Sequence, residues 1–335
     1  MSKKINIGIM GFGHIGRYIY ENALNSDYFE VKVISDIGNI ESLQYLLNNN
    51  LRNKNIDVSI ESNCFVFENK KTQFIHGVSP GDVPWDALGV DWVIDATGKF
   101  LNKEILSKHI STGAKKVILA SLPDNDLDNL IIPGINETDA RVNDQIISVG
   151  SSTTNAFAIM LKILNKFNKI KTSTITTVHS YTSDQPLLDT ANFDLKRSRS
   201  AAKNIIPNTN LSSKWIQKVL PEFKDKIFSA ALNVPVQFGS LLDMTTIFEK
   251  DFKNEDEVNN IVKEKSKEIP DLVKYIADPI VSSDVIGMKE SVVFDSFGTL
   301  KVGKNMIKTL AWYDNGYNHA SRILDVIKLY EGLES

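Results

Sequence analysis

A glycine pattern near the N-terminus constrains the fold of this chain more than any other feature. Gly11-x-Gly13-x-x-Gly16 follows a run at residues 5–12 in which apolar residues alternate with polar or small ones, and it leads into residues 15–24, where apolar residues recur at helical spacing. Glycines at such a turn let the backbone approach a pyrophosphate, and the N-terminus of the following helix offers unpaired N–H groups. The pattern therefore predicts a strand, a tight turn and a helix that bind a dinucleotide.

An acidic residue extends this prediction. Asp36 follows a second strand-like run and lies about twenty positions after Gly16, where a carboxylate can accept hydrogen bonds from an adenosine ribose. No Arg or Lys directly follows Asp36, so the sequence favours NAD over NADP, whose 2′-phosphate would meet a like charge. The predicted cofactor-binding residues of this region are Gly11, Phe12, Gly13, His14, Ile15, Gly16 and Asp36.

The hydrophobic pattern predicts two domains. Up to about residue 150, short apolar runs alternate with helical stretches, which is typical of a mainly parallel sheet. After a helical run at residues 156–167 the β-like segments become longer and are interrupted by only one helical stretch, which indicates a mixed or antiparallel sheet. The predicted fold class is α/β, with an N-terminal Rossmann domain at residues 1–150 and an α+β catalytic domain at residues 151–315.

Charge and composition exclude several kinds of partner. With 38 Lys and Arg against 41 Asp and Glu, the net charge of −3 offers no attraction for nucleic acid or for an anionic membrane. Cys64 is the one cysteine, so we expect neither a disulfide nor a multi-cysteine metal site, and the five histidines lack metal-ligand spacing. No apolar run reaches the roughly 18 residues of a membrane span, and we expect a cytoplasmic protein without a metal.

Seven motifs occur in order along the chain. They are Gly11-Phe12-Gly13-His14-Ile15-Gly16-Arg17, Ala96-Thr97-Gly98-Lys99-Phe100, Ser151-Ser152-Thr153-Thr154-Asn155, Thr177-Val178-His179, Asn204-Ile205-Ile206-Pro207, Val281-Ser282-Ser283-Asp284 and Trp312-Tyr313-Asp314-Asn315. Through them the chain resembles glyceraldehyde-3-phosphate dehydrogenase along nearly its whole length. The resemblance implies that a C-terminal helix at residues 316–335 completes the Rossmann domain, and that the protein is a homotetramer with one NAD per subunit. It also implies that Thr97, Gly98, Ser121 and Asn315 lie along the cofactor.

One position departs from the family in a way that changes the chemistry. The family carries a cysteine in the sequence Ser-Cys-Thr-Thr-Asn, and this chain has Ser152 there. In the family a thiolate adds to the aldehyde, hydride leaves for NAD and phosphate attacks the thioester, while a histidine that His179 matches handles protons. A hydroxyl is a far weaker acid than a thiol. We therefore predict that Ser152 hydrogen-bonds a carbonyl oxygen or caps the following helix, with His179 as acid or base. Cys64 is predicted to be a structural thiol.

The positions that bind phosphate in the family also differ. At one site the resemblance carries over Thr182 and Arg199, but a family arginine becomes Asn233, and Asp184 stands where other members have threonine or an acid. Loss of a bidentate guanidinium should weaken binding of a phosphate dianion. The predicted substrate-binding residues are Ser151, Thr153, Thr182, Asp184, Arg199, Asn210 and Asn233.

Three further changes accompany them. At the other phosphate site a family Thr-Gly pair becomes Asn210-Leu211, which adds bulk where the backbone should approach an anion. His14 replaces a family arginine in the glycine turn. His319 replaces a family tyrosine and serves either as a second acid or base, or as a polar loop residue at the surface.

Three hypotheses about function remain open at this stage. The first is an NAD-dependent oxidoreductase that acts on a small aldehyde or related carbonyl without thioester chemistry. The second is a non-catalytic NAD-binding subunit that regulates or assembles with a partner, including a mixed oligomer with a paralogue. The third is an ordinary phosphorylating glyceraldehyde-3-phosphate dehydrogenase that carries a Cys to Ser substitution.

Overall fold

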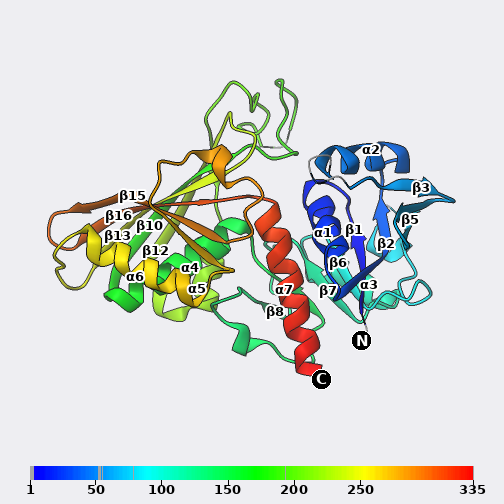
Figure 1. The fold of residues 1–335 in the computed structure, drawn as a ribbon, viewed down its shortest axis with the longest axis horizontal. Coiled ribbons are helices and arrows are strands. Elements are labelled where there is room, and N and C mark those ends of the chain that lie inside the picture. The colour runs from blue at the N-terminus through cyan, green and yellow to red at the C-terminus, as the bar shows by residue number, and fades with distance from the viewer. Residues whose placement is uncertain (1–3, 52–53, 55, 78, 193, 335) are drawn as a thin grey trace. The chain divides into compact units, whose positions relative to one another are not determined.

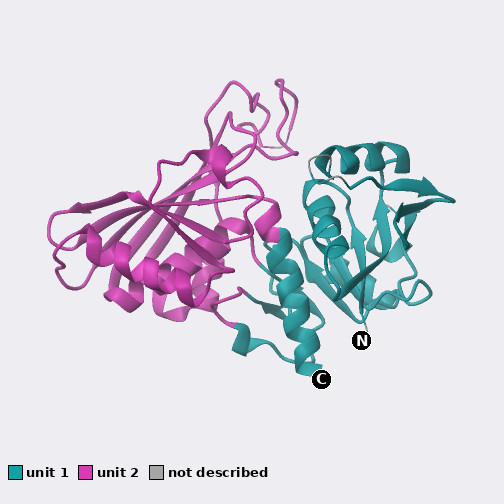
Figure 2. Cartoon of the chain, in the orientation of Figure 1, with its two compact units in different colours: residues 1–131, 137–149, 320–335 teal, residues 132–136, 150–319 magenta. Residues whose placement is uncertain are grey.

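The chain divides into two compact units. The computed structural model describes residues 4–51, 54, 56–77, 79–192 and 194–334. Unit 1 comprises residues 1–131, 137–149 and 320–335, and unit 2 comprises residues 132–136 and 150–319 (Figure 2). Residues 132–136 thus leave the N-terminal unit for a short stretch, which the sequence pattern did not indicate.

Unit 1 is built on a nine-stranded sheet with the order β3-β4-β5-β2-β1-β6-β7-β9-β8. Its strands are β1 (Ile5–Met10), β2 (Phe29–Asp36), β3 (Ser59–Glu61), β4 (Cys64–Phe67), β5 (Lys70–His76), β6 (Trp92–Asp95), β7 (Lys116–Leu119), β8 (Asn129–Leu130) and β9 (Ile146–Ser148). In this spatial order, every neighbouring pair from β5 through β2, β1, β6, β7 and β9 to β8 is parallel. The pairs β3–β4 and β4–β5 are antiparallel. Because the central strands run in parallel, their carboxyl ends meet at one edge of the sheet.

Apolar helix faces cover the sheet of unit 1. Its helical elements are α1 (His14–Leu24), α2 (Ile40–Leu51), α3 (Lys103–Ser111), the short η2 (Pro80–Asp82) and η3 (Glu137–Asp139), and most of α7 (Tyr317–Glu334). The α7 residues Ile323, Ile327 and Tyr330 are buried in the same core cluster as Trp92 of β6. The indole Nε1–H of Trp92 donates to Glu331 at 2.7 Å. The C-terminal helix is therefore part of the core of unit 1.

Unit 2 is built on a seven-stranded mixed sheet with the order β11-β12-β10-β13-β16-β15-β14. Its strands are β10 (Ile170–Ser180), β11 (Ile206–Thr209), β12 (Ile227–Val234), β13 (Ser240–Phe248), β14 (Val273–Ile276), β15 (Val292–Val302) and β16 (Met306–Tyr313). Its helices are α4 (Ser152–Phe167), α5 (Ser212–Val219) and α6 (Glu255–Glu268), with the short η4 (Pro221–Phe223) and η5 (Ser282–Val285). In Figure 1 these three helices lie together against one face of the sheet. The prediction of a mixed second sheet is confirmed.

Two strands of this sheet place the main candidate residues. The strands β10 and β12 are parallel neighbours, and their register pairs His179 with Asn233. Alternate residues of β13 and β16 face the helices and are buried, while the intervening residues are half-exposed on the other face. The carboxyl end of β10 carries the polar residues His179 and Ser180.

Candidate functional site

The predicted cofactor turn of unit 1 has the geometry that a pyrophosphate requires. Gly11 has φ +89°, a conformation that favours glycine, and a Cβ at Gly16 would collide with the carbonyl oxygen of Gly11. A Cβ at Gly13 would meet nothing within 4 Å. Gly13 is also the N-cap of α1, and it offers no side-chain acceptor to the first turn of the helix. The amide groups of that turn remain available to an anion.

Asp36 lies at the carboxyl end of β2, next to this turn. Its Oδ2 accepts from Phe12 N at 2.5 Å, and its Oδ1 accepts from Gly38 N at 2.8 Å. Each carboxylate oxygen can accept more than one hydrogen bond. Asp36 can therefore hold the turn in place and still accept from a ribose hydroxyl.

A buried chain of hydrogen bonds supports a second part of the cofactor region. The indole Nε1–H of Trp85 donates to His109 Nδ1 at 3.1 Å, and His109 Nε2 lies 3.3 Å from Asp95 Oδ2. Because Nδ1 accepts, the proton of a neutral His109 is on Nε2 and points to Asp95. The other oxygen of Asp95 accepts from Thr97 N at 3.0 Å and from Thr97 Oγ1 at 2.6 Å. Thr97 leads into Gly98, whose φ is +66°, so this chain fixes the turn after β6.

Two buried hydroxyl groups lie at the same edge of the sheet. Ser35 Oγ, in β2, and Ser121 Oγ, just after β7, are both buried and have no hydrogen-bond partner among the described residues. The strands β2, β1, β6 and β7 are adjacent and parallel, and ligands of such sheets bind outside the carboxyl ends where the connections diverge. Unpartnered hydroxyls, an open glycine position and an uncapped helix together fit a dinucleotide such as NAD.

The N-terminus of α4 positions Ser152 in unit 2. Ser151 is the N-cap, since its Oγ accepts from Thr154 N at 3.1 Å, and Ser152 is the first helical residue. The expectation that Ser152 caps the helix is thus wrong, because the neighbouring Ser151 takes that role. Within the described chain Ser152 makes no hydrogen bond through its hydroxyl. The hydroxyl is therefore available to a ligand at a helix N-terminus, which attracts negative charge.

His179 lies near the end of β10. Its Nδ1 lies 2.6 Å from the carbonyl oxygen of Ser180, which can only accept, so the proton is on Nδ1 and Nε2 keeps a lone pair. Burial lowers the pKa of His179, and the nearby Arg197 lowers it further, while the hydrogen bond to Ser180 partly opposes this. His179 is therefore a neutral imidazole at physiological pH.

Tyr313 connects the two predicted catalytic residues. Its hydroxyl lies 2.6 Å from Thr153 Oγ1, next to Ser152, and its ring lies 6.4 Å from that of His179. Burial raises the pKa of Tyr313 far above its usual range, so the phenol stays protonated. Among the described residues no hydrogen bond joins Ser152 to His179. The pair thus shares a neighbour without forming a Ser–His nucleophile.

Asn315 lies with this group in unit 2. Its Nδ2 donates to Ser180 Oγ at 2.6 Å and lies 3.4 Å from His179 Nδ1, and its Oδ1 accepts from Ser240 Oγ at 2.7 Å. The remaining predicted cofactor residues belong to unit 1. The role of Asn315 toward NAD therefore stays a prediction.

The side-chain amide of Asn233 is hydrogen-bonded to other residues of the protein and is not directed at a ligand. It is 4% exposed, and its Nδ2 donates to Gln185 Oε1 at 2.8 Å and to the Ser180 carbonyl at 3.4 Å. Its Oδ1 accepts from Asn208 Nδ2 at 3.2 Å. Since both amide hydrogens are used, Asn233 has no donor left for a phosphate.

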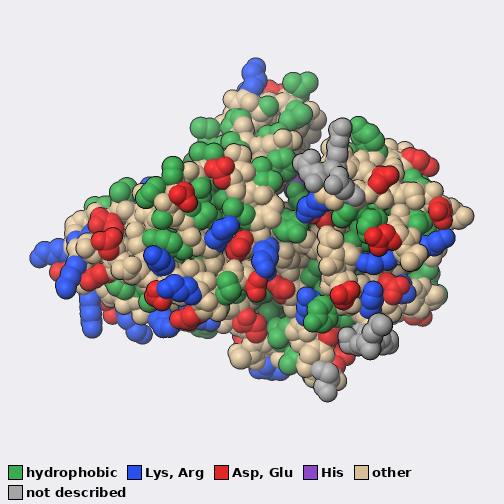
Figure 3. All heavy atoms as spheres, in the orientation of Figure 1, with side chains coloured by type: hydrophobic (Ala, Val, Ile, Leu, Met, Phe, Trp, Pro, Cys, Tyr) green, Lys and Arg blue, Asp and Glu red, His purple; other side chains and the backbone are tan. Residues whose placement is uncertain are grey.

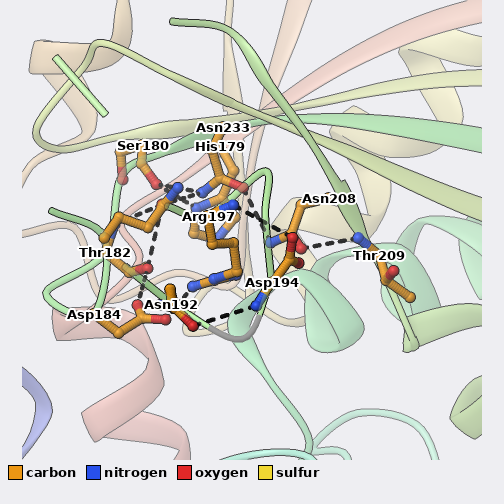
Figure 4. Close-up of polar contacts among 11 residues, drawn as sticks. His179, Ser180, Thr182, Asp184, Asn192, Asp194, Arg197, Asn208, Thr209 and Asn233 are labelled. Carbon is orange, nitrogen blue, oxygen red and sulfur yellow. Dashed lines mark hydrogen bonds and ion pairs between the residues drawn. The ribbon is translucent and has the colours of Figure 1, made fainter. Parts of the chain in front are cut away.

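The guanidinium group that lies near His179 belongs to Arg197, which the sequence analysis did not single out. Figure 4 shows Arg197 directed at Asp184, with which it forms an ion pair, and Asp184 also accepts from Thr182 Oγ1. The predicted Arg199 instead pairs with Asp189 at 3.1 Å, and both of these side chains are well exposed. Arg197 and Arg199, in the segment between β10 and β11, therefore each form an ion pair with a carboxylate of the same chain.

The second predicted anion site is also occupied by the protein's own groups. Asn210 Oδ1 accepts from Ser212 N at 2.8 Å, and Ser213 N donates to Ser229 Oγ at 3.1 Å. These amides are the first donors of α5, so its N-terminus is already capped. Leu211 precedes the helix and is 42% exposed.

Three other residues singled out from the sequence have defined places in the structure. His319 lies in α7 and is 4% exposed, so the interpretation as a polar loop residue at the surface is wrong; burial of the helix face that carries it explains the difference. Cys64 begins β4, as its strand-like surroundings predicted, and is half-buried. His14 begins α1, and its ring lies 4.7 Å from that of Tyr18.

Several functional candidates were not predicted from the sequence. They are Arg197, Gln185, Asn208, Tyr313 and the chain formed by Trp85, His109 and Asp95. Tyr313 stands in a motif that carried the resemblance, which was a usable signal. For the others, the hydrogen bonds and ion pairs join residues that are distant in sequence. The spacing of residues along the chain does not predict such contacts.

Neither a membrane-spanning helix nor a metal-binding cluster is found among the described residues. No helix in this part of the chain is long and apolar enough to cross a membrane. No group of three or more His, Cys, Asp and Glu side chains in the described ranges is arranged to hold a metal ion.

The fold and the cofactor region define a class of protein. A parallel sheet with this glycine turn and an acid after β2 is typical of an NAD-dependent oxidoreductase with a Rossmann domain. Comparisons with known proteins agree. Residues 5–103 match the family model described as the glyceraldehyde 3-phosphate dehydrogenase NAD binding domain, and residues 151–315 match that of its C-terminal domain.

The chain belongs to the glyceraldehyde-3-phosphate dehydrogenase family. It is 36% identical to glyceraldehyde-3-phosphate dehydrogenase 1 of Bacillus cereus over 324 residues, which cover 96% of each chain. It is 38% identical to the glyceraldehyde-3-phosphate dehydrogenase of Thermotoga maritima over 96% of this chain and 98% of that one. The corresponding protein of Geobacillus stearothermophilus is 35% identical over 96% of this chain and 97% of its own. The predicted fold class and the NAD cofactor are thereby confirmed.

Proposed function

We propose that this protein is an NAD-dependent oxidoreductase that acts on a small aldehyde or related carbonyl compound lacking a phosphate group, without a thioester intermediate. The observation that carries the proposal is the charge balance of the segment between β10 and β11, whose arginines are both paired with carboxylates. Arg197 is paired with Asp184, Arg199 is paired with Asp189, and a neutral Asn233 replaces the family arginine. A phosphate dianion would have to displace carboxylates from both guanidinium groups, which costs part of its binding free energy.

The residues of unit 2 have distinct roles in this proposal. Ser152 Oγ–H and the first amides of α4 donate to the carbonyl oxygen, where negative charge develops during the reaction. In the oxidising direction His179 Nε2 takes the proton of the alcohol or of the aldehyde hydrate as the C–H hydride departs, giving aldehyde or acid respectively. In the reverse direction the imidazolium returns that proton to the carbonyl oxygen. The Ser180 carbonyl, which accepts from Nδ1–H, holds the ring of His179 in place.

The cofactor supplies the hydride chemistry when it is bound: its nicotinamide accepts or donates the hydride. The glycine turn and the first turn of α1 would hold the pyrophosphate, and Asp36 would accept from the ribose. Thr97, Gly98 and Ser121 would line the same edge of the sheet, and Asn315 is proposed to contact the nicotinamide carboxamide.

A non-catalytic NAD-binding subunit is the second candidate. The specific observation in its favour is that Ser152 and His179 form no hydrogen bond with each other within the described chain. The ordinary phosphorylating reaction is the third candidate. It requires that Ser152 is a substitution of the catalytic cysteine and that both altered anion sites still bind phosphate.

We also propose a cytoplasmic homotetramer. The helices cover one face of the sheet of unit 2, and the other face exposes large apolar side chains such as Phe228, Phe297 and Leu300. Such a surface is typical of an interface between subunits. Native mass spectrometry of the protein purified from its source cell distinguishes a homotetramer from a mixed oligomer with a paralogue.

A paired-substrate assay tests the proposed activity. NADH absorbance is followed with purified protein, NAD and either glyceraldehyde or glyceraldehyde 3-phosphate, each with and without inorganic phosphate. We expect kcat/KM to be at least as high for the unphosphorylated aldehyde, to be independent of inorganic phosphate, and to fall at least about a hundredfold in His179→Asn. Turnover of the phosphorylated substrate alone would contradict the proposal, and no turnover with any carbonyl would favour the non-catalytic subunit.

A further inference from the structure

A cavity lies between α4 and α6 on the helical side of unit 2. Its volume is about 500 Å³, which is within the range of about 300–1,000 Å³ typical of small-molecule sites. Its lining comes from residues 132–136, from the second half of α4 with the residues just after it, and from α6 with Ile269. Nothing in the proposed reaction uses this cavity.

The floor of the cavity is apolar. Ile159 and Ile163 are four residues apart, so they lie on one face of α4, and they are 2% and 3% exposed. Ile261 of α6 and Ile135 are half-buried and complete the floor. A ligand body of alkyl or aryl carbon would remove this surface from water.

One rim of the cavity is cationic. The exposed side chains of Lys162, Lys166 and Lys169 line it from α4 and the residues that follow. Lys162 Nζ donates to the carbonyl oxygens of Gly134 at 2.7 Å and Ile135 at 3.2 Å, which fixes the ammonium at the rim without cancelling its charge.

The acidic residues of the opposite rim are already paired. Glu264 binds Lys267 at 2.7 Å, and Glu268 binds Lys265 at 2.6 Å. Among the residues that the structure describes, Lys169 has no carboxylate within ion-pairing distance. Figure 3 shows Lys and Arg side chains interspersed with acidic ones over the helices of unit 2. The cavity mouth therefore carries an excess of positive charge above an apolar floor.

The cavity is distinct from the proposed catalytic site. Ser152 begins α4, whereas Ile159 lies seven residues further along the helix. At about 1.5 Å per residue this separates the two by about 10 Å along the helix axis, and Lys166 lies about 20 Å from Ser152.

We propose that this cavity binds a small amphipathic carboxylate, with its hydrocarbon body on the isoleucine floor and its carboxylate among the three lysines. A monocarboxylate fits better than a phosphate ester, because Glu264 and Glu268 also line the cavity and repel a dianion more strongly than a monoanion. The proposal does not depend on the activity of the protein.

Calorimetric titration of the full-length protein with octanoate tests it. Lys166→Gln with Lys169→Gln removes two rim charges at exposed positions, and Ile261→Ser alters the half-buried floor. Lys171→Gln is the matched control, since Lys171 is exposed nearby on β10 and does not line the cavity. Octanol provides a neutral ligand of the same length.

We expect saturable binding of octanoate that weakens about tenfold in the double lysine variant and is unchanged in Lys171→Gln. Octanol should bind more weakly than octanoate and be insensitive to the lysine changes, while Ile261→Ser should weaken both ligands. The proposal is overturned by the absence of saturable octanoate binding, or by equal affinity in the parent protein and the double lysine variant. The lysines would then serve only to complement the C-terminal dipole of α4.

Discussion

Replacing His109 with phenylalanine should remove the hydrogen bonds that connect the turn at Thr97 with the core of unit 1. His109 is fully buried between Trp85 and Asp95, and Asp95 holds both the amide and the hydroxyl of Thr97. His109→Phe leaves the indole N–H and one carboxylate oxygen buried without a partner, at a cost of about 1–3 kcal/mol each. With about 1 kcal/mol regained from apolar packing, we expect a loss of about 3 kcal/mol in the free energy of unfolding.

Scanning calorimetry and NAD titration measure the two consequences. A loss of about 3 kcal/mol lowers Tm by about 6–12 °C in a domain of this size. The dissociation constant of NAD should rise several-fold, because the turn at Thr97 loses its anchor. Lys108→Phe, at an exposed position of the same helix, is the control and should change neither quantity. An unchanged Tm in His109→Phe, or unchanged affinity for NAD, would refute the reasoning.

Three further predictions follow from unit 2. Ser151→Ala removes the cap of α4 and the acceptor of Thr154 N, so chemical denaturation should show a loss of about 1 kcal/mol; a loss below about 0.3 kcal/mol would contradict the capping role. Burial lowers the pKa of His179 below its ordinary 6.5, so the neutral base persists as the pH falls. A pH profile of kcat/KM should therefore stay level from about pH 8 to 6.5 and decline below that. The contribution of His179 to the free energy of unfolding is present above pH 6.5 and should be lost as the pH falls through the lowered pKa. The double variant Asp184→Asn, Asp189→Asn frees two guanidinium groups, so inorganic phosphate should bind about fivefold more tightly by competition assay; unchanged phosphate affinity would mean that the ion pairs do not control the site.

Much of the fold follows from local patterns in the sequence. The glycine turn, the acid after β2 and the alternation of apolar runs predicted the parallel sheet, because each depends on neighbours along the chain. The helix α4 begins at Ser152, four residues before the apolar spacing indicated, because Ser151 supplies a cap. The helix α5 was missed because it is short, and η5 and β14 carry too few residues for a periodic signal.

The candidate site was less accessible from the sequence. His179 and Ser152 could be identified because they stand in short motifs. Asn233 could be recognised as a lost arginine, but its bonds to Gln185 and Asn208 join three segments that only the folded sheet brings together. The choice between Arg197 and Arg199 likewise depends on which carboxylate each one meets, and side-chain pairing of this kind leaves no periodic trace in the sequence.

The chemistry at position 152 is the central claim, and one comparison tests it most directly. NADH absorbance is measured for the purified protein and for Ser152→Cys, with NAD and a panel of aldehydes with and without phosphate groups. The account predicts that the parent protein turns over an unphosphorylated aldehyde and that the cysteine variant is no faster. It is contradicted if the parent is silent and Ser152→Cys oxidises glyceraldehyde 3-phosphate in a phosphate-dependent reaction.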